Sequence, residues 1–150
     1  MDMYTTTFSA MKDLFFLENI GESVSCIYAD NSNLELVGTN DDINFQNNYS
    51  SEGSTIFATF SNLITRQMNF FANKGYQGAC YQLDSNTVLT DDQSIYYQNK
   101  AVQGGVTFAI NDSIFTKNRD KFIQNLASED GSVLYALYNS NPRALSFIEC

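Results

Sequence analysis

The stretch Gly75-Tyr-Gln-Gly-Ala-Cys-Tyr-Gln-Leu-Asp84 begins the part of the chain from which we predict the fold. Its apolar and polar residues alternate with a period of two, which is typical of β-strands. Short apolar runs continue past Tyr97-Gln-Asn-Lys100 to the pair Gly104-Gly105, with turn-forming residues at 84–86 and 91–92 between them. We therefore predict four strands joined as an antiparallel meander, at residues 79–83, 87–89, 94–98 and 106–110.

Helical periodicity surrounds this meander. A long helix is predicted over residues 55–73, with Lys74 and Gly75 suited to its C-terminal end. Its apolar stripe at i, i+3 and i+4 spacing consists of Ile56, Phe57, Phe60, Leu63, Ile64, Met68 and Phe71. Further helices are predicted near residues 7–17 and 113–128. Asn141-Pro142 suits the start of a short C-terminal helix, with proline at the first helical position.

The remaining segments complete the expected order. Residues 24–28 and 34–38 alternate and are predicted to form a hairpin, whereas the polar residues 39–54 are expected to form a surface loop. Ser132–Tyr138 is nearly all apolar and predicts a central strand buried on both faces.

This order predicts an α+β fold, with a central antiparallel meander sheet and N-terminal, long middle and C-terminal helices packed on it. We find neither a Gly/Pro-rich linker nor an internal repeat, so residues 1–150 are expected to form one domain. The apolar fraction of 43%, with 12 Phe and 9 Tyr, indicates a folded core.

The charge is unevenly distributed. The net charge is −9, and residues 1–65 hold nine acids but a single base, Lys12. Such an acidic protein is not expected to bind nucleic acid or an anionic membrane surface. Because seven of the eight bases lie in residues 66–150, an acidic partner is expected to dock on that half.

The sequence offers little equipment for catalysis. It has no histidine, the usual base for a serine or cysteine nucleophile. Asp41-Asp42 and Asp91-Asp92 lack the spacing of a calcium loop and are interpreted as solvated turns, and Gly104-Gly105 lacks the lysine of a phosphate loop. We therefore expect no enzyme activity, no metal and no cofactor. The three cysteines are widely spaced, and apolar runs such as Leu14–Leu17 are far too short to span a membrane, so a cytoplasmic protein without membrane insertion is expected.

Five segments together resemble profilins, the small proteins that bind actin monomers. They are Phe70–Gly75, Gly78–Tyr81, Asn99-Lys100, Gly104–Thr107 and Val133–Tyr138. The order of elements is similar over nearly the whole chain. The absence of tryptophan, the extra helix at 113–128 and the loop at 39–54 indicate a divergent profilin, of the kind described for Asgard archaea or some protists.

The resemblance implies a monomeric protein that binds monomeric actin and regulates its polymerisation at the cytoskeleton. Carried over by position, the implied actin-binding face is Phe71, Lys74, Gln82, Leu83, Lys100, Thr107, Asn141 and Arg143. Tyr4 and Phe8 are the aromatics nearest to the family's site for proline-rich peptides. Without tryptophan and with a short last helix, little binding of such peptides is expected.

A second class of binding protein fits the same order of elements. Roadblock and longin domains resemble it too, and they act as dimerising scaffolds for small GTPases. The helix at 55–73 would then form the dimer interface, so gel filtration separates a dimeric scaffold from a monomeric profilin. An enzyme of unknown class is the third alternative, and the missing histidine disfavours it.

Overall fold

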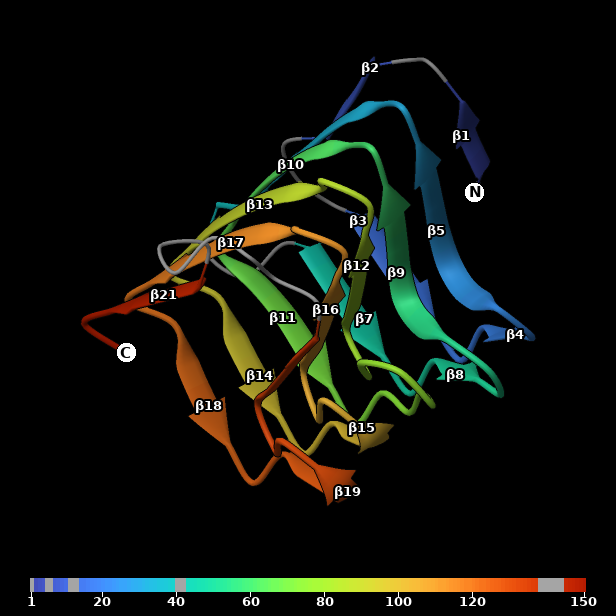
Figure 1. The fold of residues 1–150 in the computed structure, drawn as a ribbon, viewed down its shortest axis with the longest axis vertical. Coiled ribbons are helices and arrows are strands. Elements are labelled where there is room, and N and C mark those ends of the chain that lie inside the picture. Colours follow the sequence, from blue (N-terminus) through green and yellow to red (C-terminus); the bar gives the residue numbers. More distant parts are fainter. Residues whose placement is uncertain (1, 5–6, 11–13, 40–42, 138–144) are drawn as a thin grey trace.

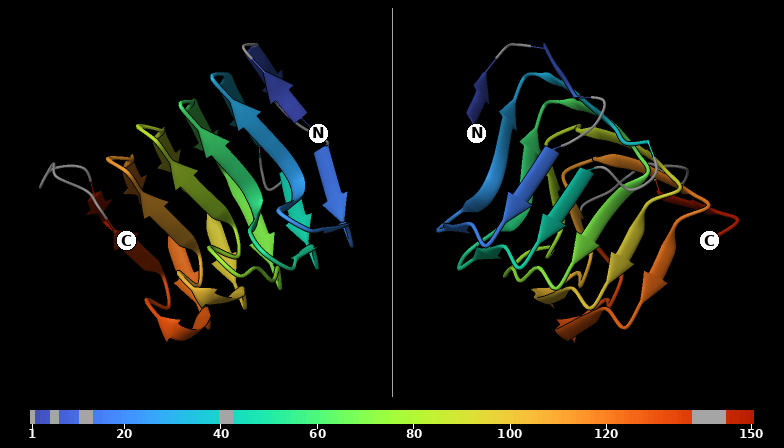
Figure 2. Two further views of the ribbon diagram at one scale, coloured as in Figure 1. Left: turned by 45° about the vertical axis from the view of Figure 1, so that its right-hand side comes forward. Right: turned by 180° about the vertical axis from the view of Figure 1, so that it is seen from behind.

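The computed structural model describes residues 2–4, 7–10, 14–39, 43–137 and 145–150, and each element of regular structure among them is a β-strand. The chain winds through successive coils that stack on one another as a parallel β-solenoid (Figure 1). Seen from the side, strands of the same sheet lie next to one another in chain order, with the two ends of the chain at opposite ends of the stack (Figure 2).

Three parallel sheets form the walls of the solenoid. The first consists of β1 (Asp2–Tyr4), β5 (Val24–Asp30), β9 (Ser54–Thr59), β12 (Tyr81–Asp84), β16 (Thr107–Ile110) and β20 (Leu134–Leu137). The second consists of β2 (Thr7–Ala10), β6 (Asn33–Val37), β10 (Asn62–Arg66), β13 (Val88–Asp92), β17 (Ile114–Asn118) and β21 (Leu145–Ile148). The third consists of β3 (Leu14–Leu17), β7 (Ile43–Gln46), β11 (Met68–Phe71), β14 (Ile95–Tyr97) and β18 (Lys121–Ile123).

Two short pairs lie at the corner after the third sheet. They are β4 (Ile20–Gly21) with β8 (Tyr49–Ser50), and β15 (Lys100–Gln103) with β19 (Leu126–Asp130). Single bridges join Tyr49 to Lys74 and Lys74 to Lys100, so this corner also continues from coil to coil.

A repeated pattern of an aromatic residue followed three positions later by asparagine builds the stack. It occurs at Phe16/Asn19, Phe45/Asn48, Phe70/Asn73, Tyr96/Asn99 and Phe122/Asn125. Successive asparagines are 29, 25, 26 and 26 residues apart. The expectation of no internal repeat is therefore wrong. The repeated unit is one coil, and few of its residues are identical from one coil to the next.

The asparagines form a hydrogen-bonded ladder. The backbone N–H of Asn48 donates to Oδ1 of Asn73 at 3.0 Å, and the Asn73 N–H donates to Oδ1 of Asn99 at 3.0 Å. The side-chain amide of Asn73 also donates to Oδ1 of Asn99 and to the carbonyl of Phe45. Each turn of the ladder thus satisfies buried polar groups that would otherwise cost about 1–3 kcal/mol apiece.

The aromatic members of the pattern stack along the interior. Ring centroids are 4.6 Å apart for Phe16 and Phe45, 4.8 Å for Phe45 and Phe70, and 5.1 Å for Phe70 and Tyr96. The column ends at Phe122, whose ring lies 5.2 Å from that of Tyr96. Inward-facing aliphatic residues such as Ile56 and Leu63 fill the remaining core.

The corners require left-handed backbone at residues other than glycine. The residue before each ladder asparagine has a positive φ, at Glu18, Asn47, Ala72, Gln98 and Gln124. Each such residue costs about 1 kcal/mol or more. Their N–H groups compensate by donating across coils, as from Ala72 to the carbonyl of Tyr97 at 2.9 Å.

The predicted α+β fold is wrong. Residues 55–73, predicted as one long helix, form β9, β10 and β11 on three different sheets. Within a strand inward residues are two apart, as at Ile56 and Ala58, and each corner lengthens one interval. The resulting mixture of spacings imitates a helical stripe. It also combined core residues such as Leu63 with exposed ones such as Phe60, which is 60% exposed.

The other elements are corrected in the same way. The expected helix at 113–128 is β17, β18 and β19, and the expected surface loop at 39–54 contains β7 and β8. The region of the expected first helix at 7–17 contains β2 and β3. Strands were correctly expected at 79–83, 94–98 and 106–110, but each pairs in parallel with strands one coil away, so the antiparallel meander and the hairpin of residues 24–38 do not form. The start of the predicted C-terminal helix at 141–142 lies outside the described residues.

Candidate functional site

Lys74 and Lys100 lie side by side on the surface, and we call this pair the lysine ridge. Both side chains are exposed, and a parallel bridge places the two residues in register on adjacent coils. They belong to a row that directly follows the asparagine ladder and consists of Ile20, Tyr49, Lys74, Lys100 and Leu126. The side chains at all five positions are exposed, although the residue type changes from coil to coil.

In the ridge, two exposed cations lie next to each other without an acidic partner among the described residues, whereas Lys121, also exposed and without a salt bridge there, lies apart on β18. Arg66 and Arg119 both pair with Asp92, at 3.5 and 2.8 Å, and Lys117 is buried against acids. No salt bridge to Lys74 or Lys100 forms among these residues. Two like charges in direct register repel each other, so the ridge costs folding energy and gains from an added anion.

Hollows border the ridge on two sides. One, of about 350 Å³, is lined by Ala72, Lys74, Gln98, Lys100 and Gln124. Another, of about 380 Å³, lies toward Tyr49 and Tyr76, which are 44% and 43% exposed. Gln98 donates through its side-chain amide to Gln124 at 2.9 Å, forming a polar wall. The ridge is thus flanked by aromatic rings on one side and amides on the other.

Three of the residues predicted as an actin-binding face do lie on neighbouring positions. Phe71 precedes the corner that carries Lys74, and its ring stacks on Tyr97 at 5.3 Å. Lys100 lies beside Lys74 on the next coil.

The other predicted residues do not join them. Leu83 is in the core, Thr107 is buried, and Gln82 is a covered residue of the first sheet that donates to Gln77 at 3.0 Å. Asn141 and Arg143 lie outside the described residues. Of the two residues expected near a proline-peptide site, Tyr4 lies in β1, and Phe8 lies in β2 and packs against the core.

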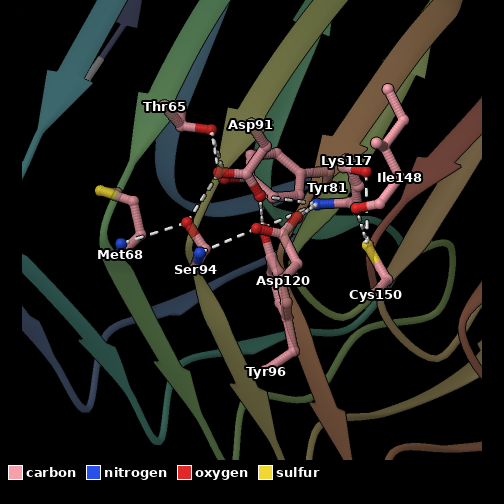
Figure 3. Close-up of polar contacts among 10 residues, drawn as sticks. All are labelled: Thr65, Met68, Tyr81, Asp91, Ser94, Tyr96, Lys117, Asp120, Ile148 and Cys150. Atoms are coloured by element: carbon pink, nitrogen blue, oxygen red, sulfur yellow. Dashed lines mark hydrogen bonds and ion pairs between the residues drawn. The ribbon is translucent and has the colours of Figure 1, made fainter.

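A second polar cluster is buried inside the solenoid (Figure 3). Lys117 on β17 places its Nζ 2.9 Å from Oδ2 of Asp91 on β13 and 3.9 Å from Oδ2 of Asp120, and all three side chains are inaccessible to solvent. Oδ1 of Asp91 accepts from Thr65 at 2.8 Å and from Ser94 at 2.6 Å. Tyr96 donates its hydroxyl to Oδ2 of Asp91 and accepts from Lys117 at 2.7 Å.

The two acids of this cluster have opposite proton affinities. Burial raises the pKa of Asp91, but the charge of Lys117 and hydrogen bonds from Ser94 and Tyr96 outweigh it, so its pKa lies below the ordinary value. Burial and the charge of Asp91 raise the pKa of Asp120 to about 8. At neutral pH the cluster therefore holds a charged Lys117–Asp91 pair and a protonated Asp120.

Asp120 also borders a cavity. The cavity has a volume of about 630 Å³ and is lined mainly by apolar side chains, including Phe122, Val133 and Phe147. The thiol of Cys150, at its rim, lies 3.3 Å from the carbonyl of Lys117. One carboxyl group of the buried cluster thus lies next to a surface cavity, although the carboxyl group itself is covered.

Sequence reasoning missed this cluster. Asp91 was interpreted as a solvated turn residue, but it points inward from β13 and is fully buried. The available signal was the interval of 26 residues between Asp91 and Lys117, which matches the spacing of neighbouring ladder asparagines.

The described residues show no metal site or membrane-spanning helix, and the chain has no match among known proteins. The described part of the chain contains no group of three His, Cys, Asp or Glu side chains arranged to hold a metal ion. None of its residues belongs to a helix long and apolar enough to cross a membrane. No protein-family model, curated protein or solved structure matches this chain. The resemblance to profilins is wrong, because the described residues form a parallel β-solenoid and contain neither a helix nor the antiparallel sheet on which the resemblance rested.

Proposed function

We propose that this protein is a non-catalytic binding protein that holds an acidic polysaccharide at the lysine ridge. The observation that carries the proposal is the exposure of Lys74 and Lys100 in register, with no acidic partner among the described residues. On a protein of net charge −9, such an island of positive charge gives a local attraction for anions that operates within about one Debye length. It also agrees with the expectation that an acidic partner docks on the second half of the chain.

The surroundings favour a sugar chain. Exposed Tyr49 and Tyr76 offer rings with an apolar face and a polar hydroxyl, which suit the mixed surface of a sugar. The amides of Gln98 and Gln124 add donors and acceptors for hydroxyl groups. Adjacent coils place equivalent residues about 4.8 Å apart, so the surface runs along the solenoid and suits an extended ligand.

The expected actin-monomer partner is not part of this proposal. Nothing in the structure tests it, and it has lost the resemblance on which it depended. The helix that was expected to form the dimer interface of a roadblock-like scaffold does not form, because residues 55–73 lie in strands. The monomeric state, the cytoplasmic location and the lack of enzyme activity stay predictions.

Binding measured by titration calorimetry tests the proposal. The ligands are polygalacturonate as a carboxylated chain, heparin as a sulfated chain, dextran as a neutral chain and polyglutamate as an acidic peptide. We expect binding to an acidic polysaccharide but not to dextran. Lys74→Glu and Lys100→Glu should each weaken it about tenfold, and added salt should weaken it too.

Lys121→Glu is the matched control, because Lys121 is an exposed lysine on β18 away from the ridge. It should leave the affinity within about twofold of the unmodified protein. An equal loss in the control would show that only net charge matters and would overturn the assignment to the ridge. Binding to polyglutamate alone would overturn the choice of ligand.

A further inference from the structure

The buried Lys117–Asp91–Asp120 cluster is the feature that the proposed function leaves unexplained. A buried ion pair contributes little net stability compared with apolar residues of the same volume. This cluster also contains a second acid, whose Oδ2 is buried and accepts no hydrogen bond. Its composition therefore requires another reason.

The amine and a carboxyl group are held in contact where water is excluded. Nζ of Lys117 lies 2.9 Å from Oδ2 of Asp91, and both side chains are fully buried. Rings surround the amine, with Tyr96 at 4.1 Å, Tyr81 at 4.8 Å and Phe122 at 6.0 Å from Nζ to the ring centroid. Holding two reacting groups together in this way replaces a slow bimolecular encounter with a step inside one molecule.

The groups around the pair match the needs of amide formation. Thr65 and Ser94 both donate to Oδ1 of Asp91, where negative charge develops when an amine attacks the carboxyl carbon. Oδ2 of Asp120 lies 3.9 Å from Nζ and forms no hydrogen bond, so a shift of under about 1 Å brings it within reach to take one proton and supply another. Oδ1 of Asp120 accepts a hydrogen bond from the backbone N–H of Ser94 at 2.8 Å, and this bond fixes the orientation of the carboxyl group.

We propose that Lys117 and Asp91 form an intramolecular amide bond that covalently joins β13 to β17. A proton first passes from Nζ to Asp91, which leaves a neutral amine and a neutral carboxyl group. Nζ then attacks Cγ of Asp91. Asp120 accepts a proton from the nitrogen and donates its own proton to Oδ2, and the bond between Cγ and Oδ2 breaks.

The step balances without any further reactant. An amine N–H and a carboxyl C–OH become an amide and one water molecule, and Asp120 is returned protonated. Oδ1 remains as the amide oxygen with its two hydrogen bonds. The cavity beside Asp120 gives the water an exit. Lys117 is the nucleophile and Asp120 is the proton relay.

Intact-mass and peptide spectrometry of the purified, folded protein tests this proposal. We expect a mass lower than that of the unmodified chain by one water molecule. A tryptic digest should contain residues 75–100 joined to residues 101–119, with no cleavage after Lys117. A full, unmodified mass after prolonged incubation of the folded protein would overturn the proposal, and so would a link from Lys117 to Asp120.

Three variants assign the roles. Lys117→Arg, which keeps the charge but lacks the amine, should show the unmodified mass. Asp120→Asn should slow the reaction strongly, while Asp91→Asn should lose ammonia in place of water, because nitrogen then leaves from the same carbon. Lys121→Arg is the matched control and should react like the original protein. The main test measures the mass of the protein without any substitution, so it remains valid even if a variant fails to fold. It is also independent of whether the protein binds a polysaccharide.

Discussion

The asparagine ladder and the row Leu36, Thr65, Asp91 and Lys117 are both buried columns that run from coil to coil, but they use repetition differently. The ladder places the same residue at each level, so each amide meets an identical neighbour and every bond is repeated. The second row changes from an apolar residue to a hydroxyl, an acid and a base. Each contact between neighbours in this row therefore occurs only once. The repeated column specifies the fold, and the varied column supplies a single chemical site.

The strongest test of this comparison removes one charge from the varied row. Lys117→Met leaves Asp91 buried without its cation, and we expect a loss of about 3–5 kcal/mol in the free energy of unfolding relative to the protein in which the proposed amide bond has not formed. The double variant Lys117→Met with Asp91→Leu should recover most of that loss, because neither charge remains. Urea denaturation monitored by circular dichroism measures both. A double variant as unstable as the single one would contradict the account of a mismatched buried charge.

The pH dependence of stability probes the same row in protein that has not formed the proposed amide bond, where the carboxyl group of Asp91 is still free. The pKa of Asp120 is raised to about 8 in the folded protein, so the folded state binds a proton that the unfolded state has released. Stability should therefore fall as pH rises from about 5 to 7, by up to about 1.4 kcal/mol per pH unit, and should level off once the pH exceeds the folded pKa. Below about pH 4, protonation of Asp91, whose pKa is lowered, should reduce stability again.

Asp120→Asn is the control for this prediction, because it removes the titrating group but keeps the shape. Thermal unfolding from pH 4 to 9 should lose the decline between 5 and 7 in this variant. An unchanged pH profile would show that Asp120 does not titrate in this range.

The ladder should be most sensitive in its middle. Asn73→Ala leaves buried donors and acceptors on both neighbouring coils without partners, and we expect a loss of about 2–3 kcal/mol. Asn125→Ala, at the half-buried last level, should cost less because solvent replaces part of its bonding. Chemical denaturation of both variants measures the two losses, and equal losses would contradict the claim that burial sets the cost of a missing ladder amide.

The smallest effect is expected at the corners. Gln98 has a φ of 57°, so Gln98→Gly should stabilise the protein by up to about 1 kcal/mol by removing backbone strain. Thr90→Gly, in the middle of β13, should destabilise by a similar amount, since glycine there only adds freedom to the unfolded chain. The midpoint of unfolding should therefore rise in Gln98→Gly and fall in Thr90→Gly. Destabilisation at both positions would contradict the assigned corner.

The sequence predicted several strands but not how they pair. Residues 94–98 follow a period of two because β14 has one buried face, whereas β12 and β16 are buried at nearly every residue. That period carries no information on whether the neighbour is the next strand in the chain or the strand one coil away. The helix predicted at 55–73 is wrong for a related reason. Two corners within this segment shift the inward positions, so the spacing of its apolar residues imitates that of a helix.

The sequence selects both residues of the lysine ridge but does not predict that they lie side by side. Lys74 and Lys100 were both selected as binding residues, although the resemblance that suggested them was wrong. Their proximity depends on the repeat interval of 26 residues, which places one directly above the other. The buried cluster was beyond prediction without that interval, because an inward lysine is unexpected until its acidic partner is known.

The central claim is that strands one coil apart pair in parallel, and disulfide trapping tests it most directly. Val88 and Ile114 are in register on β13 and β17, with a strand spacing that suits a disulfide. In a Cys150→Ser background, the pair Val88→Cys with Ile114→Cys should oxidise to a disulfide detected by peptide mass. Val88→Cys with Ile95→Cys, which an antiparallel meander would bring together, should stay reduced. A disulfide in the second pair but not in the first would contradict the solenoid.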